Sequence, residues 1–324
     1  MESHNRVEGY QKNKEVEEVL YELNRILELG KRKDSGEHIE HTYPVVFVVG
    51  AARSGTTLLM QSLIHYGEIA YPSNIMSRFY KHPYFGSLLH KLFVDLDFKE
   101  EFLLNNDIHF TSDLGKTKGA RSPHEFWYFW NEYFRFGEIQ RLSTAELAQV
   151  DIKGFKADIA SIMSVFNKPV VMKASNMNWH VDYLLDAIPN SYILHIERDI
   201  RYNAQSLLMA RRKYFGTIDT WYSFKPPNYS ELKNMPPIEQ VLHQVIENNR
   251  AIKSVMHSEA RNNHRYWHIS YEELCSEPTM VCQEVLDIWQ IKKSQTATSY
   301  ALKDQNRKTD YWPEIDAAAR NLGY

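Results

Sequence analysis

Four short apolar runs along the chain predict buried strands. Residues 45–49 read VVFVV and lie between Pro44 and Gly50, which is typical of a strand buried on both faces of a parallel sheet. Three further runs follow at residues 170–173, 192–196 and 266–270. Because a segment with helical spacing separates the second run from the third, the pattern predicts a βαβ unit and therefore a parallel sheet.

Apolar positions at helical spacing fill the intervals around these runs. Leu59, Leu63 and Tyr66 mark a helix directly after the first run, and another begins near Pro237. Near the N-terminus, one helical face collects Val16, Val19, Leu20, Leu23, Ile26 and Leu27. We therefore expect a helical extension over residues 1–42 and a single domain over residues 43–324. The predicted fold is α/β, a three-layer sandwich with a central parallel sheet.

The composition narrows the range of functions. The 324 residues include 38 Lys and Arg against 41 Asp and Glu, which excludes a general nucleic-acid binder because such proteins carry a strong basic excess. Two cysteines, Cys275 and Cys282, are too few for a disulfide framework, so we expect a reducing compartment. The sequence has neither a signal peptide nor an apolar run long enough to span a bilayer, so we expect a soluble protein of the cytoplasm.

The segment VGAARSGTTL, directly after the first strand, carries the most specific chemistry. Its glycines have the spacing of a nucleotide phosphate loop, G-x-x-x-x-G-K-[ST]. Small residues let successive backbone N–H groups close around an anion, and the following helix points its positive end at the same place. Thr56 replaces the lysine of such loops, and Arg53 supplies a cation within the loop. Since phosphoryl transfer relies on that lysine and on a bound metal, we expect binding of a 5′-phosphate-type group without a metal ion.

Residues Gly50 to Leu59 resemble the 5′-phosphosulfate loop of the sulfotransferases, in particular of bacterial and carbohydrate-modifying members. The resemblance implies a P-loop NTPase-like fold, with 3′-phosphoadenosine 5′-phosphosulfate (PAPS) as sulfuryl donor and 3′,5′-ADP (PAP) as product. It also implies an acceptor hydroxyl, which we expect on a glycan or glycolipid, and no metal ion. The implied donor-binding residues of the loop are Gly50, Arg53, Ser54, Gly55, Thr56 and Thr57.

Two further segments resemble the same family. Arg198 follows the third strand run and Ser206 comes eight residues later, a pair that the resemblance assigns to the 3′-phosphate. The family commonly continues with Arg-Asp-Pro, whereas this chain has Ile200 and Arg201 after Asp199, which places another cation nearby. In the segment His268 to Leu274, the resemblance puts Tyr271 beside the adenine. The acidic residues after Tyr271 also suit the first turn of a helix.

The catalytic groups follow partly from the chemistry and partly from the resemblance. Sulfuryl transfer needs a cation at the leaving oxygen and a base at the acceptor hydroxyl. Arg53 and the strand-end Lys173 are the candidate cations. Related strands often continue from the lysine to a catalytic histidine, but Ser175 stands there and is a poor base.

The base is therefore expected in the segment Pro123-His124-Glu125-Phe126, which resembles a segment of some bacterial sulfotransferases. Glu125 or His124 is the candidate, and we expect only one of these adjacent side chains to face the acceptor. Apolar walls would raise the pKa of Glu125 towards the working range of a base. His180 is a weaker alternative. The aromatic residues between Arg121 and Phe136 suit either acceptor stacking or core packing.

Two other functions remain open from the sequence. A nucleotide kinase with a degenerate phosphate loop would need the lysine that Thr56 replaces, and it would give Arg198 and Ser206 no role. A non-catalytic nucleotide-binding protein would bind 3′,5′-ADP without transferring sulfate. The basic segment Asn306-Arg307-Lys308 either reaches the 3′-phosphate or is a solvated charge run. The oligomeric state is left open.

Overall fold

The first apolar run forms β1 (Val45–Val49) at the centre of the sheet. The computed structural model describes residues 6–30, 43–97, 99–102, 110, 112–255 and 264–324. β2 (Val170–Lys173) and β3 (Ser191–Glu197) flank β1, and β4 (Tyr266–Ser270) pairs with β3, all in parallel. The order β2-β1-β3-β4 confirms the four predicted strands and the parallel sheet. The predicted βαβ unit runs from β2 to β3 and crosses β1, so its two strands are not neighbours.

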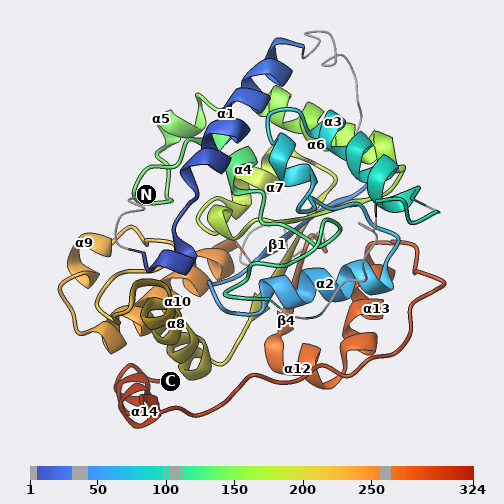
Figure 1. Cartoon of the computed structure of the whole chain (residues 1–324). Helices are drawn as coiled ribbons and strands as arrows, with labels where there is room; N and C mark the ends of the chain where they lie inside the picture. The colour runs from blue at the N-terminus through green and yellow to red at the C-terminus, as the bar shows by residue number, and fades with distance from the viewer. Residues whose placement is uncertain (1–5, 31–42, 98, 103–109, 111, 256–263) are drawn as a thin grey trace.

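Helices cover the two faces of this sheet (Figure 1). Val45, Phe47 and Val49 point to one face, which is covered by α4 (Trp127–Phe134), α6 (Ile152–Phe166) and α7 (Val181–Ala187). Val46 and Val48 point to the other face, which is covered by α2 (Thr56–Tyr66), α12 (Tyr271–Ser276) and α13 (Pro278–Ile288). Because successive side chains of a strand alternate, a fully apolar strand requires both layers. The predicted three-layer α/β sandwich is confirmed.

A third group of helices packs beside the loop that follows β1. It consists of α8 (Ile200–Phe215), α10 (Pro237–Ser254) and α14 (Trp312–Asn321). Their apolar side chains form one cluster that includes Ala51 of the loop. The shorter elements are η1 (Glu8–Tyr10), η2 (Met76–Phe79), α3 (Pro83–His90), the π-helical η3 (Lys91–Asp95), α5 (Thr144–Leu147), η4 (Ser175–Met177) and α9 (Tyr229–Leu232).

The N-terminal residues lie against the rest of the chain. α1 (Lys14–Leu29) starts at Asn13, whose side chain accepts a hydrogen bond from the Val16 N–H. Before it, the Val7 N–H donates to the Tyr214 carbonyl at 3.2 Å, and the Tyr10 and Tyr214 rings lie 4.8 Å apart. The predicted helix exists, but its apolar face is only partly covered, since Val19 is 62% exposed and Ile26 54%. Residues 31–42 of the expected extension lie outside the described residues.

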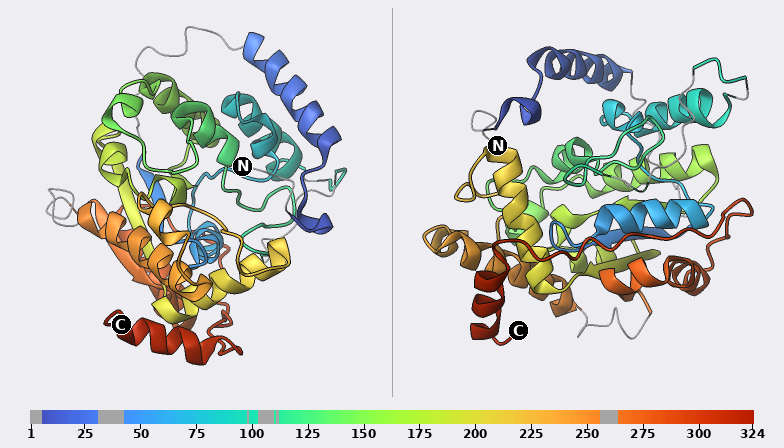
Figure 2. Two further views of the ribbon diagram at one scale, coloured as in Figure 1. Left: turned by 90° about the vertical axis from the view of Figure 1, so that its left-hand side faces the viewer. Right: turned by 60° about the horizontal axis from the view of Figure 1, so that its bottom comes forward.

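The C-terminal residues cross the molecule before they end in a helix. Between α13 and α14 the chain follows a long irregular path, which Figure 2 shows passing across the other elements. This path brings residues 305 and 306 to the carboxyl edge of the sheet, where Gln305 N–H donates to the Tyr271 hydroxyl at 3.0 Å. Across the described part of the chain, no helix is long and apolar enough to cross a membrane.

Candidate functional site

The loop between β1 and α2 depends on its two glycines. Gly55 has a φ of +107°, which L side chains rarely adopt, and a Cβ there would lie 2.6 Å from the Tyr271 ring. A Cβ at Gly50 would lie 2.5 Å from the carbonyl oxygen of Ile196. The backbone therefore approaches β3 and α12 more closely than any side chain would allow. The predicted strand, loop and helix are all present.

The backbone of this loop is arranged to receive an anion. Every carbonyl from Gly50 to Arg53 accepts a hydrogen bond, from Asn178, Ser54, Asn203 and Arg198 respectively. By contrast, the N–H groups of Arg53, Gly55 and Thr56 have no protein acceptor among the described residues. The Ser54 hydroxyl is also buried, and the described part of the chain offers it no partner. Unpaired donors at the start of a helix form the kind of cradle that binds phosphate.

The predicted 3′-phosphate residues meet at one side of this cradle. Arg198 extends from the end of β3, and its guanidinium donates to the Arg53 carbonyl at 3.3 Å. The Arg53 Nε donates to the Ser206 hydroxyl on α8 at 3.3 Å. Tyr271 lies beneath the Arg198 guanidinium, 4.5 Å from ring centroid to cation. Arg53 therefore turns towards Ser206 and not towards the far end of the loop, where Lys173 lies.

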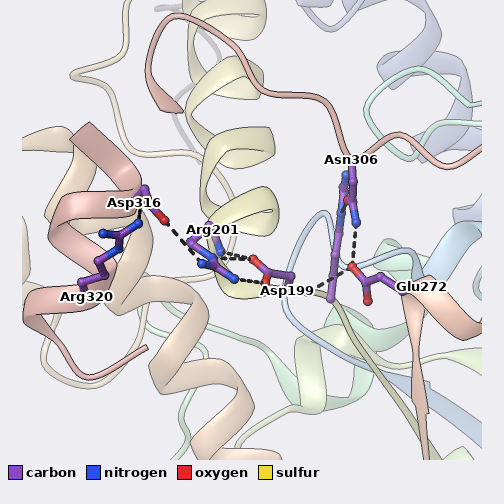
Figure 3. Close-up of polar contacts among 7 residues, drawn as sticks. Asp199, Arg201, Glu272, Asn306, Asp316 and Arg320 are labelled. Atoms are coloured by element: carbon purple, nitrogen blue, oxygen red, sulfur yellow. Dashed lines mark hydrogen bonds and ion pairs between the residues drawn. The ribbon is translucent and has the colours of Figure 1, made fainter. Parts of the chain in front are cut away.

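Asn306 and Glu272 fix Arg198 in this position; the sequence indicated Asn306 only as part of the segment 306–308 and indicated no role for Glu272 at the phosphate site. The Arg198 Nε donates to Asn306 Oδ1 at 2.7 Å, and Asn306 Nδ2 donates to Glu272 Oε1 at 2.8 Å (Figure 3). In the segment 306–308, Asn306 therefore contacts Arg198, the residue that is expected to bind the 3′-phosphate. Lys308 instead lies over the Trp312 ring, 5.0 Å from its centroid. In the sequence, the basic character of residues 306–308 was the one feature that pointed to this part of the chain.

Lys173, Thr57 and Glu125 come together at the other end of the loop. Lys173 Nζ at the end of β2 donates to Thr57 Oγ1 at 3.2 Å, and it forms an ion pair with the Glu125 carboxylate. Thr57 belongs to the first turn of α2 and also donates to the Gly115 carbonyl at 3.3 Å. A small cavity of about 10 Å³ lies among these residues, next to His124. A cation, a carboxylate and a hydroxyl thus stand beside the anion cradle.

The expectation that apolar walls raise the pKa of Glu125 is wrong, because the pKa is lowered. Burial by itself would raise the pKa of Glu125, but the charge of Lys173 and its hydrogen bond outweigh burial and hold the pKa below the usual value. The Glu125 side chain keeps 49% of its surface accessible, against 11% for Lys173. The carboxylate is therefore ionised at neutral pH and open to a ligand.

His124 lines the same cavity as Glu125. That only one of the pair faces the acceptor stays a prediction. Phe126 has a φ of +55° at the start of α4, and this turn brings the preceding residues to one side. Burial lowers the pKa of His124 to about 4, so the ring is neutral at pH 7. Its Nδ1 accepts the Phe126 N–H at 2.9 Å, which assigns the ring proton to Nε2. His124 can therefore donate a hydrogen bond but has no free acceptor nitrogen.

The sequence profile of the sulfotransferase family matches residues 44–294. The chain belongs to the sulfotransferase family. Among solved structures, it is similar to sulfotransferase STF1 from Mycobacterium tuberculosis H37Rv, with 14% identity over 95% of this chain and 86% of that chain and a TM-score of 0.51. It is also similar to sulfotransferase STF9 from Mycobacterium avium, with 14% identity over 95% of this chain and 71% of that chain and a TM-score of 0.47. At this identity the likeness shows the fold alone. A search of curated proteins found no match.

Arg201 does not add a free cation to the site of this sulfotransferase. Its guanidinium pairs with Asp199 at 2.7 Å and with Asp316 of α14 at 3.3 Å (Figure 3). Asp199 in turn accepts the Arg201 N–H at the start of α8. The replacement of the usual proline by Ile200 therefore leaves a capped helix and a neutralised arginine.

Two groups of residues considered for the sulfotransferase site have structural roles. His180 is 4% exposed, and its Nε2 accepts the Leu142 N–H at 2.8 Å, which removes it as an alternative base. Four aromatic side chains of the segment between Arg121 and Phe136 are buried around Phe155: Phe126, Phe129, Trp130 and Phe134. For these four the structure supports core packing, one of the two interpretations left open. In the described residues, no group of three or more His, Cys, Asp or Glu side chains could hold a metal ion.

Proposed function

We propose that this sulfotransferase transfers a sulfuryl group from PAPS to an acceptor hydroxyl by in-line displacement. The observation that carries the proposal is a pair of neighbouring groups that can bind anions, one formed by the loop itself and one formed beside it. The open N–H groups of the loop suit a 5′-phosphosulfate, and Arg53, Arg198 and Ser206 suit a 3′-phosphate beside it. A ligand with phosphates at both positions of one ribose matches this pair of sites.

In this proposal each residue of the donor site has a role. The open N–H groups of Arg53, Gly55 and Thr56 bind the 5′-phosphosulfate together with the hydroxyls of Ser54, Thr56 and Thr57, and Gly50 keeps the loop close to β3. Arg198 and Ser206 bind the 3′-phosphate with Arg53, and Tyr271 lies beside the adenine. Lys173 contacts Thr57 and therefore lies at the end of the cradle. From there its ammonium group neutralises the charge that develops on the oxygen between phosphate and sulfur.

We propose Glu125 as the base. The acceptor oxygen attacks sulfur, the bond from sulfur to the 5′-phosphate oxygen breaks, and the acceptor proton passes to the carboxylate. Glu125 is ionised and accessible, whereas the only basic nitrogen of neutral His124 already accepts the Phe126 N–H. His124 Nε2–H then supplies a hydrogen bond to the acceptor.

Thermal shift and labelled sulfate together test this function. Stabilisation by 3′,5′-ADP, but not by ATP with magnesium, supports the sulfotransferase and contradicts the kinase. Transfer of label from PAPS to glycans, glycolipids, phenols or amines identifies the acceptor. Binding of 3′,5′-ADP without transfer to any of these compounds would instead support a non-catalytic nucleotide-binding protein.

The acceptor class, the compartment and the domain organisation are also proposals. We propose a glycan or glycolipid hydroxyl, since the loop and the Pro-His-Glu-Phe segment resemble bacterial and carbohydrate-type enzymes. Both cysteines, Cys275 and Cys282, are buried and unpaired, which favours a reducing compartment such as the cytoplasm. We further propose that residues 43–324 form one domain and that residues 1–42 are its extension.

Arg198→Ala is expected to weaken 3′,5′-ADP binding roughly tenfold or more, because a charge-assisted bond to phosphate contributes about 1.5–3 kcal/mol. Binding of 5′-ADP, which has no 3′-phosphate, should change little, and calorimetry measures both affinities. Arg201→Ala is the matched control, since Arg201 already pairs with two carboxylates. Equal losses for both nucleotides would mean that Arg198 has only a structural role.

Sulfate transfer is expected to continue at its full rate in excess EDTA. The proposed reaction uses Lys173 and the loop N–H groups where phosphoryl transfer uses a metal ion. Label transfer measured with EDTA and with added magnesium checks this expectation. A strict requirement for magnesium would favour the kinase.

A further inference from the structure

We propose that Asn178 and Asn203 are positioning residues for the sulfuryl donor, because they orient the peptide groups of the anion loop. This inference rests on the proposed function. Both side chains lie behind the loop, are fully buried and contact its carbonyl groups.

Asn178 holds both polar atoms of Gly50. It follows η4 in the connection between β2 and α7, and its Oδ1 accepts the Gly50 N–H at 3.3 Å. Its Nδ2 donates to the Gly50 carbonyl at 3.0 Å and to Asn248 Oδ1 on α10 at 2.8 Å. Asn248 Nδ2 donates in turn to the Gln244 carbonyl at 2.8 Å, so the amide chain ends on a helix backbone. The first residue of the loop is thereby connected through Asn178 to α10.

Asn203 holds the loop two residues further on. Its Nδ2 on α8 donates to the Ala52 carbonyl at 2.7 Å. Its Oδ1 is buried and has no partner among the described residues. A buried amide with an unpaired acceptor destabilises the fold. Within the described residues, the single hydrogen bond of the Asn203 side chain is to the loop, which indicates that its role lies there.

The geometry of the peptide bond links these carbonyls to the anion cradle. In a trans peptide, the C=O of one residue and the N–H of the next point in opposite directions within one plane. When Asn203 holds the Ala52 carbonyl behind the loop, the Arg53 N–H points to the opposite side, where it has no protein acceptor among the described residues. Asn178 directs the Ala51 N–H in the same way. The two asparagines thus fix donors that would otherwise be free to rotate.

The test compares two nucleotides that differ only in the 5′-phosphate. Wild-type protein should bind 3′,5′-ADP more tightly than adenosine 3′-phosphate. In Asn178→Ala and in Asn203→Ala, the affinity for 3′,5′-ADP should fall roughly tenfold, the size expected for one hydrogen bond or more. The affinity for adenosine 3′-phosphate should stay within about twofold. The two affinities therefore converge in each variant.

Gln240→Ala is the matched control, because Gln240 of α10 is also a buried amide, and its partners, Arg211 and the carbonyls of Lys233 and Met235, do not belong to the loop. It should lower the melting temperature and leave both affinities unchanged. If Asn178→Ala does not fold, Asn178→Ser and Asn203→Ala decide the question. Equal loss of both nucleotides, or no loss in folded variants, would overturn the inference. Failure of wild-type protein to bind 3′,5′-ADP would instead contradict the proposed function.

Discussion

Glu125→Gln should lower turnover by about 10²–10⁴-fold, the usual contribution of a general base, with 3′,5′-ADP affinity within a few-fold of wild type. The amide keeps the size of the side chain but cannot take the acceptor proton. It also cannot form the ion pair with Lys173, although it can still accept a hydrogen bond from that ammonium group. Steady-state transfer of label from PAPS and calorimetry with 3′,5′-ADP measure the two quantities.

His124→Asn is the companion variant, and its effect should be smaller and confined mainly to the KM of the acceptor. Its Nδ1 is already bonded to the Phe126 N–H, so the ring can only donate to a ligand. If Glu125→Gln keeps full turnover and His124→Asn loses it, the two roles are reversed. Full activity of both variants would place the base elsewhere, although not at His180, whose Nε2 is bonded to the Leu142 N–H.

Lys173→Met should lower turnover by about 10²–10³-fold, the loss typical of removing one group that stabilises transition-state charge. The affinity for 3′,5′-ADP should fall as well, because the oxygen that Lys173 faces stays on the 5′-phosphate of this product. Methionine retains the length of the side chain at the end of β2. Single-turnover transfer from PAPS gives the rate of the chemical step.

The same substitution should change the pH dependence in a defined direction. Lys173 is the main cause of the low pKa of Glu125, and burial opposes it. Without the lysine the pKa rises, so the variant should lose residual activity at a higher pH than wild type as the solution is acidified. Lys116→Met is the matched control, since Lys116 has a smaller effect on Glu125 and no hydrogen bond to it. An acid limb at the same pH in Lys173→Met and wild type would contradict the ion pair.

Local sequence was sufficient for the strands and the anion loop. The unbroken apolar run in β1 requires cover on both faces, and the structure has helical layers there. The spacing of the two loop glycines alone marks a phosphate-binding turn, whereas the contacts that require them, with Ile196 and Tyr271, come from distant parts of the chain. The position of Arg198 and Ser206 beside the loop was also predictable, because the end of a strand and the next helix face the same crevice. Their binding of the 3′-phosphate stays a prediction.

The sequence by itself therefore determined the α/β class, the four strands, the loop and the family, because each follows from residues close together in the chain. Tertiary structure alone decided the strand order, the hydrogen bond between Arg198 and Asn306, and the charge state of the proposed base. Glu125 and Lys173 are 48 residues apart, and Asn306 and Arg198 are 108 apart. Spacing predicts no such contact, since packing of distant segments brings the groups together. The pKa of a carboxyl depends on the partner that packing supplies, so the sequence led to a raised value where the ion pair lowers it.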